Sequence, residues 1–483
     1  MNLLDASLNR NRCYVDGAWV AADSGRQIEV RDPANGGIVG SVPDMGTLET
    51  QRAIDAAERA FGPWRDRTAH ERAKLLRRWY ELLLEHQNDL AVLMTLEQGK
   101  PVTEARGEIA YAAGYIEWFA EEAKRIDGDV IASPWPDKRI VVLKEPVGVC
   151  AAITPWNFPA AMITRKVAPA LAAGCTIIVK PATQTPLSAL ALADLADRAG
   201  IPAGVVNVLT GKASVIGGVL TSSKTVRKLT FTGSTEVGRT LAAQCAPTLK
   251  KMSLELGGNA PFIVFDDADI DAAVDGAILS KYRNTGQTCV CANRFLVQDG
   301  VYDTFATKLA AAVGKLLIGN GFEPNVEQGP LIDRAALEKV EALVADVVEH
   351  GGRVVRGGKR HALGGTFYEP TVLADVTPAM RVAREEIFGP VAPLIRFKTE
   401  DEAVKIANSS EFGLAAYFYA RDIGRVWRVA ARIESGMVGI NTGIISTPVA
   451  PFGGVKQSGM GREGSKYGLD DYMHTKYLCM GGL

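Results

Sequence analysis

The stretch Val-Gly-Val-Cys-Ala-Ala-Ile, residues 147–153, is a continuous apolar run. A strand without a polar position suits the interior of a parallel sheet, because helices cover both of its faces. The segments after it alternate, with strands predicted at 176–180, 205–209 and 228–231 and helices at 188–199 and before Cys245. This alternation favours a doubly wound, Rossmann-like α/β sheet, a fold that binds nucleotides.

A second alternating series begins after Glu255. Two series indicate two α/β domains, since single hydrophobic cores stop growing well below the 483 residues of this chain. We expect the boundary near residues 254–258. Strands are predicted at 261–265, 295–297, 391–397 and 415–419, and helices at 270–281, 302–313, 402–408 and 423–432.

Four segments stand outside the two series. Helices are predicted at 69–97 and 102–125, and isolated strands at 139–144 and 472–479. The last strand follows the second core in the chain, so we expect it to pair with a sheet outside that core. An unpaired strand edge can also join another copy of the chain, which predicts a homodimer or a homotetramer.

These predictions divide the chain into three parts. A cofactor-binding domain is expected from residues 1–125 and 146–253, and a second α/β domain, the catalytic domain, from residues 254–450. Residues 126–145 and 468–483 are expected to form a small β extension that bridges subunits.

The composition argues against several classes of function. Lys and Arg total 54 against 55 Asp and Glu, so no basic surface for nucleic acid or an anionic membrane is expected. Residues 1–12 lack the apolar segment of a signal peptide. The sequence contains no run of about 18 apolar residues, the length that a membrane-spanning helix needs. Seven irregularly spaced cysteines and five scattered histidines predict neither a disulfide framework nor a metal site. The sequence favours a cytoplasmic protein whose partners are small molecules or copies of itself.

The segment Asn-Thr-Gly-Gln-Thr-Cys-Val-Cys, residues 284–291, holds the candidate nucleophile. Cys289 follows a Gly-Gln-Thr turn and precedes the strand predicted at 295–297. A thiol exposed at such a junction is readily ionised near neutral pH and reactive once ionised. Taken alone, the same cysteine also fits a small side chain buried in a core.

Seven short blocks of sequence, one of them within this segment, occur in an order that is as informative as their residues. They are Thr-Pro-Trp-Asn-Phe-Pro (154–159), Lys-Pro-Ala (180–182), Phe-Thr-Gly-Ser (231–234), Leu-Glu-Leu-Gly-Gly (254–258), Gly-Gln-Thr-Cys (286–289), Glu-Glu-Ile-Phe-Gly-Pro (385–390) and Pro-Phe-Gly-Gly (451–454). Together they resemble the NAD(P)-dependent aldehyde dehydrogenase family over essentially the full chain. Residues 281–291 and 461–468 are most similar to succinate- and glutarate-semialdehyde dehydrogenases, which implies oxidation of succinic or glutaric semialdehyde to the dicarboxylate.

The resemblance implies three catalytic roles that also suit the residue types. Cys289 would add to the aldehyde, although only about 3% of a thiol with an ordinary pKa is ionised at pH 7. Asn157 and the Cys289 backbone N–H would hold the resulting oxyanion, a role worth about 3 kcal/mol. Glu255 would be the base that activates water against the thioester, because its apolar surroundings raise its pKa. In isolation, Asn157 also fits a local turn and Glu255 an exposed edge carboxylate.

For the cofactor, the turn at Gly233 and Ser234 can offer backbone N–H groups to a pyrophosphate, although it lacks the Gly-x-Gly-x-x-Gly fingerprint. The resemblance assigns Lys180 to the adenosine ribose, Glu386 to the nicotinamide ribose and Phe388 to the nicotinamide. Lys180 alone fits a solvated strand end, and Phe388 a core aromatic. The same blocks imply cofactor contacts from Thr154, Pro155, Trp156 and Ala182.

Position 183 bears on the form of the cofactor. NAD-preferring relatives often carry a glutamate there, whose charge repels a 2′-phosphate. Thr183 is neutral and small, so it leaves room for a phosphate beside Lys180. We therefore expect NADP to be preferred, with NAD as the alternative cofactor.

Two arginines near the catalytic blocks are candidate substrate ligands. Arg165 and Arg283 could offer forked donors to the carboxylate of a semialdehyde, and Ser446 matches a third polar contact in these relatives. Each arginine taken alone fits a surface ion pair. An aminoaldehyde or hydroxyaldehyde substrate, and a non-catalytic binding or structural relative, are the alternatives.

Cys291 lies two residues after the candidate nucleophile. In an extended backbone both side chains point to the same side, about 6 Å apart at Cα, which is within reach of a disulfide. Some relatives use such a pair as a redox switch. Simple packing of Cys291 is the alternative.

Overall fold

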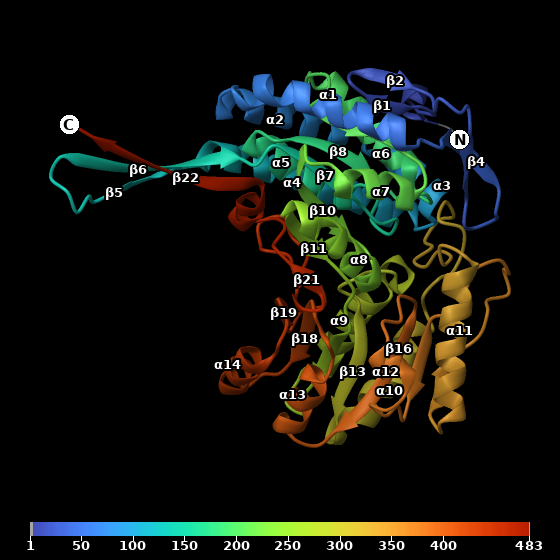
Figure 1. The fold of residues 1–483 in the computed structure, drawn as a ribbon. Coiled ribbons are helices and arrows are strands. Elements are labelled where there is room, and N and C mark those ends of the chain that lie inside the picture. Colours follow the sequence, from blue (N-terminus) through green and yellow to red (C-terminus); the bar gives the residue numbers. More distant parts are fainter. Residues whose placement is uncertain (1–2, 483) are drawn as a thin grey trace.

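The computed structural model describes residues 3–482 and contains two large sheets that lie one above the other in Figure 1. The first sheet has the strand order β2-β1-β9-β8-β7-β10-β11-β21. The chain steps from β7 outward to β9 and restarts beyond β7 with β10, so the sheet is doubly wound and its switch point lies between β7 and β10. The five parallel strands are β7 (Val149–Ile153), β8 (Thr176–Lys180), β9 (Val206–Val208), β10 (Val226–Thr232) and β11 (Lys251–Glu255).

Both faces of this sheet are buried, as the apolar run predicts. On β8, Ile177 and Val179 pack into one hydrophobic cluster, whereas Ile178 packs into another on the opposite face. Short strands border the parallel core or pair beside it. They are β1 (Cys13–Val15), β2 (Ala18–Val20), β3 (Gln27–Arg31), β4 (Ile38–Pro43) and β21 (Gly459–Met460).

Helices cover both faces of the first sheet (Figure 1). The single helix predicted at 69–97 is wrong, because the chain leaves helical geometry at His86 and begins a new helix at Gln87. The helices are α1 (Thr47–Arg65), α2 (Ala69–Glu85), α3 (Gln87–Gln98), α4 (Val102–Glu122), α5 (Ala161–Ala173), α6 (Pro186–Arg198), α7 (Ala213–Ser222) and α8 (Thr235–Cys245).

The second sheet has the order β14-β15-β16-β13-β12-β18-β19, and the strands and helices predicted for this region are present. Its strands are β12 (Ala260–Val264), β13 (Ala292–Gln298), β14 (Arg353–Arg356), β15 (Thr371–Ala374), β16 (Val391–Phe397), β18 (Ala415–Tyr419) and β19 (Met437–Ile440). The helices are α9 (Ile270–Lys281), α10 (Tyr302–Val313), α11 (Arg334–Glu349), α12 (Arg381–Arg384), α13 (Glu400–Asn408) and α14 (Ile423–Arg432). A two-stranded sheet of β17 (Phe412–Gly413) and β20 (Val455–Lys456) lies beside it.

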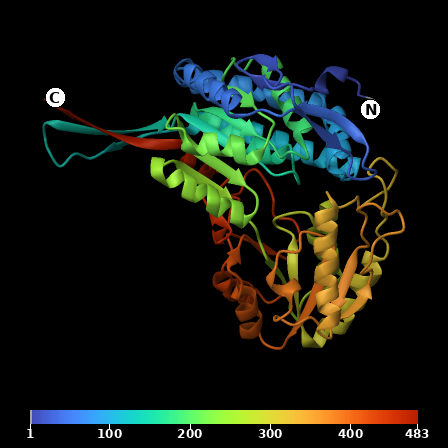
Figure 2. The same cartoon turned by 45° about the vertical axis from the view of Figure 1, so that its right-hand side comes forward.

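A three-stranded arm projects from the body of the molecule (Figures 1 and 2). It contains β5 (Asp129–Ile131), β6 (Lys138–Pro146) and β22 (Met473–Gly481), with β22 antiparallel to β6 along its whole length. Val130 is 81% exposed and Tyr477 57% exposed, so apolar surface of the arm is open to solvent. The strands predicted at 139–144 and 472–479 are thus confirmed. The division of the chain into domains at the expected residues stays a prediction.

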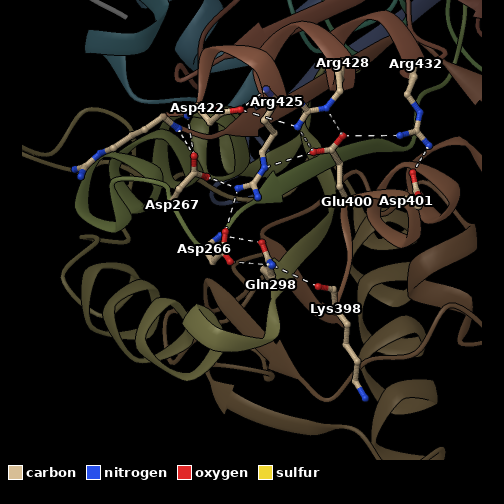
Figure 3. Close-up of polar contacts among 11 residues, drawn as sticks. Asp266, Asp267, Gln298, Lys398, Glu400, Asp401, Asp422, Arg425, Arg428 and Arg432 are labelled. Carbon is tan, nitrogen blue, oxygen red and sulfur yellow. Dashed lines mark hydrogen bonds and ion pairs between the residues drawn. The ribbon is translucent and has the colours of Figure 1, made fainter.

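Charged contacts hold α14 against the second sheet (Figure 3). Arg425 Nη1 donates to Asp266 at 3.0 Å and to Asp267 at 2.5 Å, and Arg428 pairs with Glu400 at 3.0 Å. Arg425 and Glu400 are partly buried, whereas Asp266 and Arg428 are about half exposed, and exposed ion pairs are worth about 0–1 kcal/mol each. Because none of these residues lines the cavity described below, this surface offers control positions for mutagenesis.

The described residues, 3–482, contain no helix that is both long and apolar enough to cross a bilayer. Within the same range, no three His, Cys, Asp or Glu side chains come together as a metal site would require.

Candidate active site

A cavity of about 250 Å³ lies where the two sheets meet. Residues 256–259 run from the end of β11 to the start of β12, so the carboxyl edge of the first sheet faces the amino edge of the second. The cavity therefore opens at the switch point, where a doubly wound sheet binds its ligand. It is lined by Pro155, Trp156, Asn157, Thr232, Gly233, Ser234, Glu255, Leu256, Gly257, Cys289, Ala336, Lys339, Glu386, Ile387 and Phe388.

Cys289 reaches the cavity from the loop before β13 and is partly exposed. The loop is tightly wound, with Asn284 and Thr285 at φ +51° and +59°, a region that L residues seldom adopt. Gly258 allows the close approach of this loop, because a Cβ there would lie 2.7 Å from the Cys289 carbonyl oxygen. Burial raises the pKa of the Cys289 thiol to about 12, although the guanidinium of Arg165 opposes the rise.

Asn157 lies in the loop after β7, beyond residues 154–156, and is buried. Its Nδ2 donates to the carbonyl oxygen of Gln287 at 3.0 Å, and this bond ties the amide to the loop of Cys289. An amide nitrogen has two hydrogens, so the second N–H remains available to an oxygen in the cavity. This geometry suits a hydrogen-bond donor to an oxyanion.

Glu255 is the last residue of β11 and is 2% exposed. Neither of its carboxylate oxygens has a hydrogen-bond partner within residues 3–482. Burial raises its pKa well above the usual range, and the nearby charge of Glu463 raises it further. An unpartnered carboxylate with a raised pKa at a cavity wall can take a proton from a water molecule in that cavity.

Several of the residues expected to contact the cofactor also line the cavity. Ser234 caps the N-terminus of α8, where backbone N–H groups are ready for an anion. Trp156 and Phe388 meet edge to face with centroids 5.6 Å apart. Phe388 is at φ +54°, a strained conformation that costs about 1–3 kcal/mol and is frequent at functional sites. Pro155 also lines the cavity, whereas Thr154 is buried behind it.

Glu386 also lines the cavity. Its Oε1 accepts the backbone N–H of Gly258 at 3.0 Å, and burial raises its pKa. The opposite oxygen faces Gly257, where a Cβ would lie 3.2 Å from Oε2. The two glycines of the 254–258 block therefore make room for this carboxylate.

The expected adenosine contacts lie outside this cavity, at the end of β8. Lys180 is buried, forms no ion pair within residues 3–482, and has a pKa lowered to about 8 by desolvation. An ammonium in such surroundings would be stabilised by an anionic partner. Ala182 is half-buried and Thr183 is exposed on the following turn.

Neither Arg165 nor Arg283 lines the cavity, but the charge of each lowers the pKa of the Cys289 thiol. Arg165 is 1% exposed and pairs with Glu463, a partner that sequence analysis missed. The guanidinium of Arg283 lies 5.4 Å from the centroid of the Phe158 ring. Ser446 is half-buried in the loop after β19 and does not line the cavity.

Cys291 is buried below the loop of Cys289. Its Sγ lies 3.4 Å from the carbonyl oxygen of Lys281, and both cysteines are free thiols. Packing accounts for Cys291 in this arrangement. A disulfide between Cys289 and Cys291 stays a prediction.

Sequence analysis missed several residues around the site. Lys339 and Ala336 line the cavity from α11, a helix that was not predicted. Its signal is present, because apolar residues recur at helical spacing after Asp333, which caps the helix. Lys166 pairs with Glu463 and donates to Thr232 Oγ1 at 2.6 Å, a contact without a sequence signal because the elements are distant in the chain.

The chain is similar over its full length to several known proteins. A glutarate-semialdehyde dehydrogenase of Pseudomonas aeruginosa is 66% identical over all of both chains. An NADP-dependent succinate-semialdehyde dehydrogenase of Escherichia coli is 63% identical, again over all of both chains. The crystal structure of a succinate-semialdehyde dehydrogenase from Burkholderia pseudomallei superposes with a TM-score of 0.99 at 64% identity, covering all of both chains. The family profile described as "Aldehyde dehydrogenase family" matches residues 19–478. The chain therefore belongs to the aldehyde dehydrogenase family.

Proposed function

We propose that this aldehyde dehydrogenase oxidises a carboxylated semialdehyde, succinic or glutaric, to the dicarboxylate. The observation that carries the proposal is the meeting of Cys289, Asn157 and Glu255 at one cavity, beside the turn at Gly233. Those three side chains are a nucleophile, an oxyanion donor and a base, which are the groups that oxidation through a covalent intermediate requires. The named relatives act on substrates of this class.

In the first half of the reaction, the ionised sulfur of Cys289 adds to the aldehyde carbon. The carbonyl oxygen becomes an alkoxide, which accepts hydrogen bonds from the free N–H of Asn157 and from the Cys289 backbone. A bound nicotinamide supplies the hydride acceptor. Loss of hydride re-forms the C=O bond and leaves a thioester on Cys289. Asn157 therefore stabilises a negative charge that is present in neither the bound aldehyde nor the thioester.

In the second half, water attacks the thioester. Glu255 accepts a proton from that water, and the sulfur of Cys289 leaves as a thiolate. A carboxylate with an ordinary pKa would be a weak base, so the burial that raises the pKa of Glu255 improves proton transfer. The acid product carries the new oxygen.

We propose NADP as the preferred cofactor, with NAD as the weaker alternative. The turn at Gly233 and Ser234, the edge-to-face pair of Trp156 and Phe388, and the carboxylate of Glu386 together suit a dinucleotide. Among the described residues Lys180 has no anionic partner in its buried position, and Thr183 adds no negative charge. These two residues support binding of a 2′-phosphate.

We propose a homodimer or homotetramer joined through the arm. β5 and β22 are the edges of its three-stranded sheet, and the outer side of each has no strand partner among residues 3–482. Exposed apolar side chains accompany these edges, including Val130, Ile131, Tyr477 and Met480. A second copy of the chain could cover both features.

The test is a NADP-coupled assay with succinic semialdehyde, glutaric semialdehyde and an uncharged aldehyde of similar length. Arg283→Gln should raise KM for both semialdehydes by about tenfold or more, since a charge-assisted hydrogen bond is worth about 1.5–3 kcal/mol. KM for the uncharged aldehyde should change by less than about twofold. Arg432→Gln, on the surface shown in Figure 3, is the matched control. An equal effect of Arg283→Gln on all three aldehydes would remove the carboxylate anchor from the proposal.

A further inference from the structure

The end of α3 and the link to α4, residues 97–101, are polar yet almost wholly buried. Glu97 and Gln98 are 0% exposed and Lys100 is 2% exposed. Burying such groups costs free energy unless each finds a partner. The partners lie on other elements, and two of the three connections lead to the loops that hold Asn157 and Cys289.

Lys100 holds the loop of Asn157 from behind. Its Nζ donates to the backbone carbonyl of Asn157 at 2.8 Å and lies 4.1 Å above the ring of Phe158. The same ammonium pairs with Glu108 at 2.5 Å. Glu108 in turn accepts the backbone N–H of Ala160 at 2.9 Å, which fixes the start of α5. The segment from Asn157 to Ala160 is therefore held at one end by Lys100, just before α4, and at the other by Glu108 of α4.

Gln98 is connected to the loop of Cys289 by a hydrogen bond to Asn284. Its Nε2 donates to Oδ1 of Asn284 at 3.0 Å, which fixes the orientation of that amide. The Nδ2 of Asn284 then donates to the carbonyl of Asn157 at 2.9 Å and to that of Gln287 at 3.2 Å. Gln287 is the residue whose carbonyl also receives the side chain of Asn157. Asn284 therefore bridges the two loops, and Gln98 sets its direction.

We propose that Lys100 and Gln98 are positioning residues for the oxyanion site: they fix Asn157 against the loop of Cys289 without touching the substrate. The inference rests on the proposed role of Asn157. Neither residue lines the cavity, so each acts only through its hydrogen bonds. Hydrogen-bond catalysis depends steeply on geometry, and a misplacement of about 1 Å can cost about 100-fold in rate.

The test is a pair of double-mutant cycles with Asn157→Ala, read as the rate of NADPH formation in the first turnover. Gln98→Met removes one connection. The second variant, Lys100→Met with Glu108→Gln, removes the other without leaving a buried carboxylate unpaired. Each variant should lower the first-turnover rate by about 10- to 100-fold in the wild-type background. In the Asn157→Ala background, the same changes should cost less than about twofold, since residues that act as a unit are not additive.

Two further measurements separate positioning from general damage. KM for NADP and the rate of Cys289 alkylation by iodoacetamide should stay within about threefold of wild type. Lys228→Met is the matched control, because Lys228 is equally buried but donates to Ser253, away from the cavity. It should leave the first-turnover rate within about twofold of wild type.

The outcomes are distinct. Equal rate losses in both backgrounds would overturn the positioning role while leaving the function of Asn157 intact. A first-turnover rate unchanged in Asn157→Ala itself would overturn the oxyanion role and this inference together. If the Lys100 variant fails to give the circular dichroism spectrum of the wild type, the Gln98→Met cycle decides.

Discussion

A Cβ at Gly453 would lie 2.9 Å from Oε1 of Glu255, closer than Cβ atoms approach any neighbour in real proteins. The same Cβ would lie 2.8 Å from the backbone oxygen of Gly461, so the backbone cannot move away freely. The glycine of the 451–454 block therefore provides the space that the carboxylate occupies. This contact links the C-terminal region to the chemistry of β11.

Gly453→Ala should accordingly displace Glu255 and slow thioester hydrolysis by about tenfold or more. The first turnover of hydride transfer should persist, so that a burst of NADPH precedes a slow steady state. Stopped-flow absorbance at 340 nm measures both phases. Gly62→Ala, inside α1 with no atom within 4 Å of the new Cβ, should be neutral. A Gly453→Ala enzyme without a burst and with slowed hydride transfer would contradict the expectation.

Glu255→Gln should separate the two halves of the reaction more completely. The amide cannot accept the proton of water, so turnover should fall by about 100-fold or more while the burst remains. In the wild type, only the ionised form of Glu255 is a base, and burial raises its pKa well above the usual range. The hydrolysis rate should therefore fall as pH is lowered through this raised pKa. A hydrolysis rate independent of pH between about 5 and 8 would contradict the assignment.

The rate of Cys289 alkylation should also rise with pH, but over a different pH range. Burial raises its pKa to about 12, so the thiolate is a minor species at neutral pH. Its fraction should grow about tenfold for each pH unit between about 7 and 9, and the alkylation rate should follow. Mass spectrometry of the peptide that contains Cys289 measures this rate, with Cys289→Ala as the background. A plateau below pH 9 would show a thiol with a much lower pKa.

Thr183→Glu should change the cofactor preference from NADP to NAD. A carboxylate at this exposed position would repel a 2′-phosphate near Lys180, so kcat/KM for NADP should fall by about tenfold or more. The same parameter for NAD should stay unchanged or rise, because a carboxylate can accept hydrogen bonds from ribose hydroxyls. Thr183→Gln is the neutral control of equal length. If kcat/KM changed equally for both cofactors, position 183 would have no role in their discrimination.

Part of the site could be predicted because its residues lie in loops that follow strands. Asn157 comes after β7 and Gly233 after β10, and parallel strands on either side of a switch point bring such residues together. The apolar runs of these strands could be recognised without knowing the fold. Many of the residues that line the cavity could therefore be predicted from the strand pattern together with the order of the blocks that carry the family resemblance.

The remaining contacts depend on pairings that local patterns do not encode. Arg165 was expected to be free for a substrate, yet its guanidinium is buried against Glu463. The helix that carries Arg165 is buried on every side, so it shows no amphipathic period, and Pro169 interrupts its sequence. The break between α2 and α3 at His86 also lacks the glycine or proline that usually marks such a point.

The pairing of β22 with β6 has a consequence for the order in which the molecule is made. A ribosome releases residues 138–146 long before residues 473–481, so β6 waits for its partner throughout synthesis of the second sheet. During that interval, the edge of β6 that later pairs with β22 has no strand partner. The assembly that we propose through the arm needs β22 in place, so it could begin only after translation has almost ended.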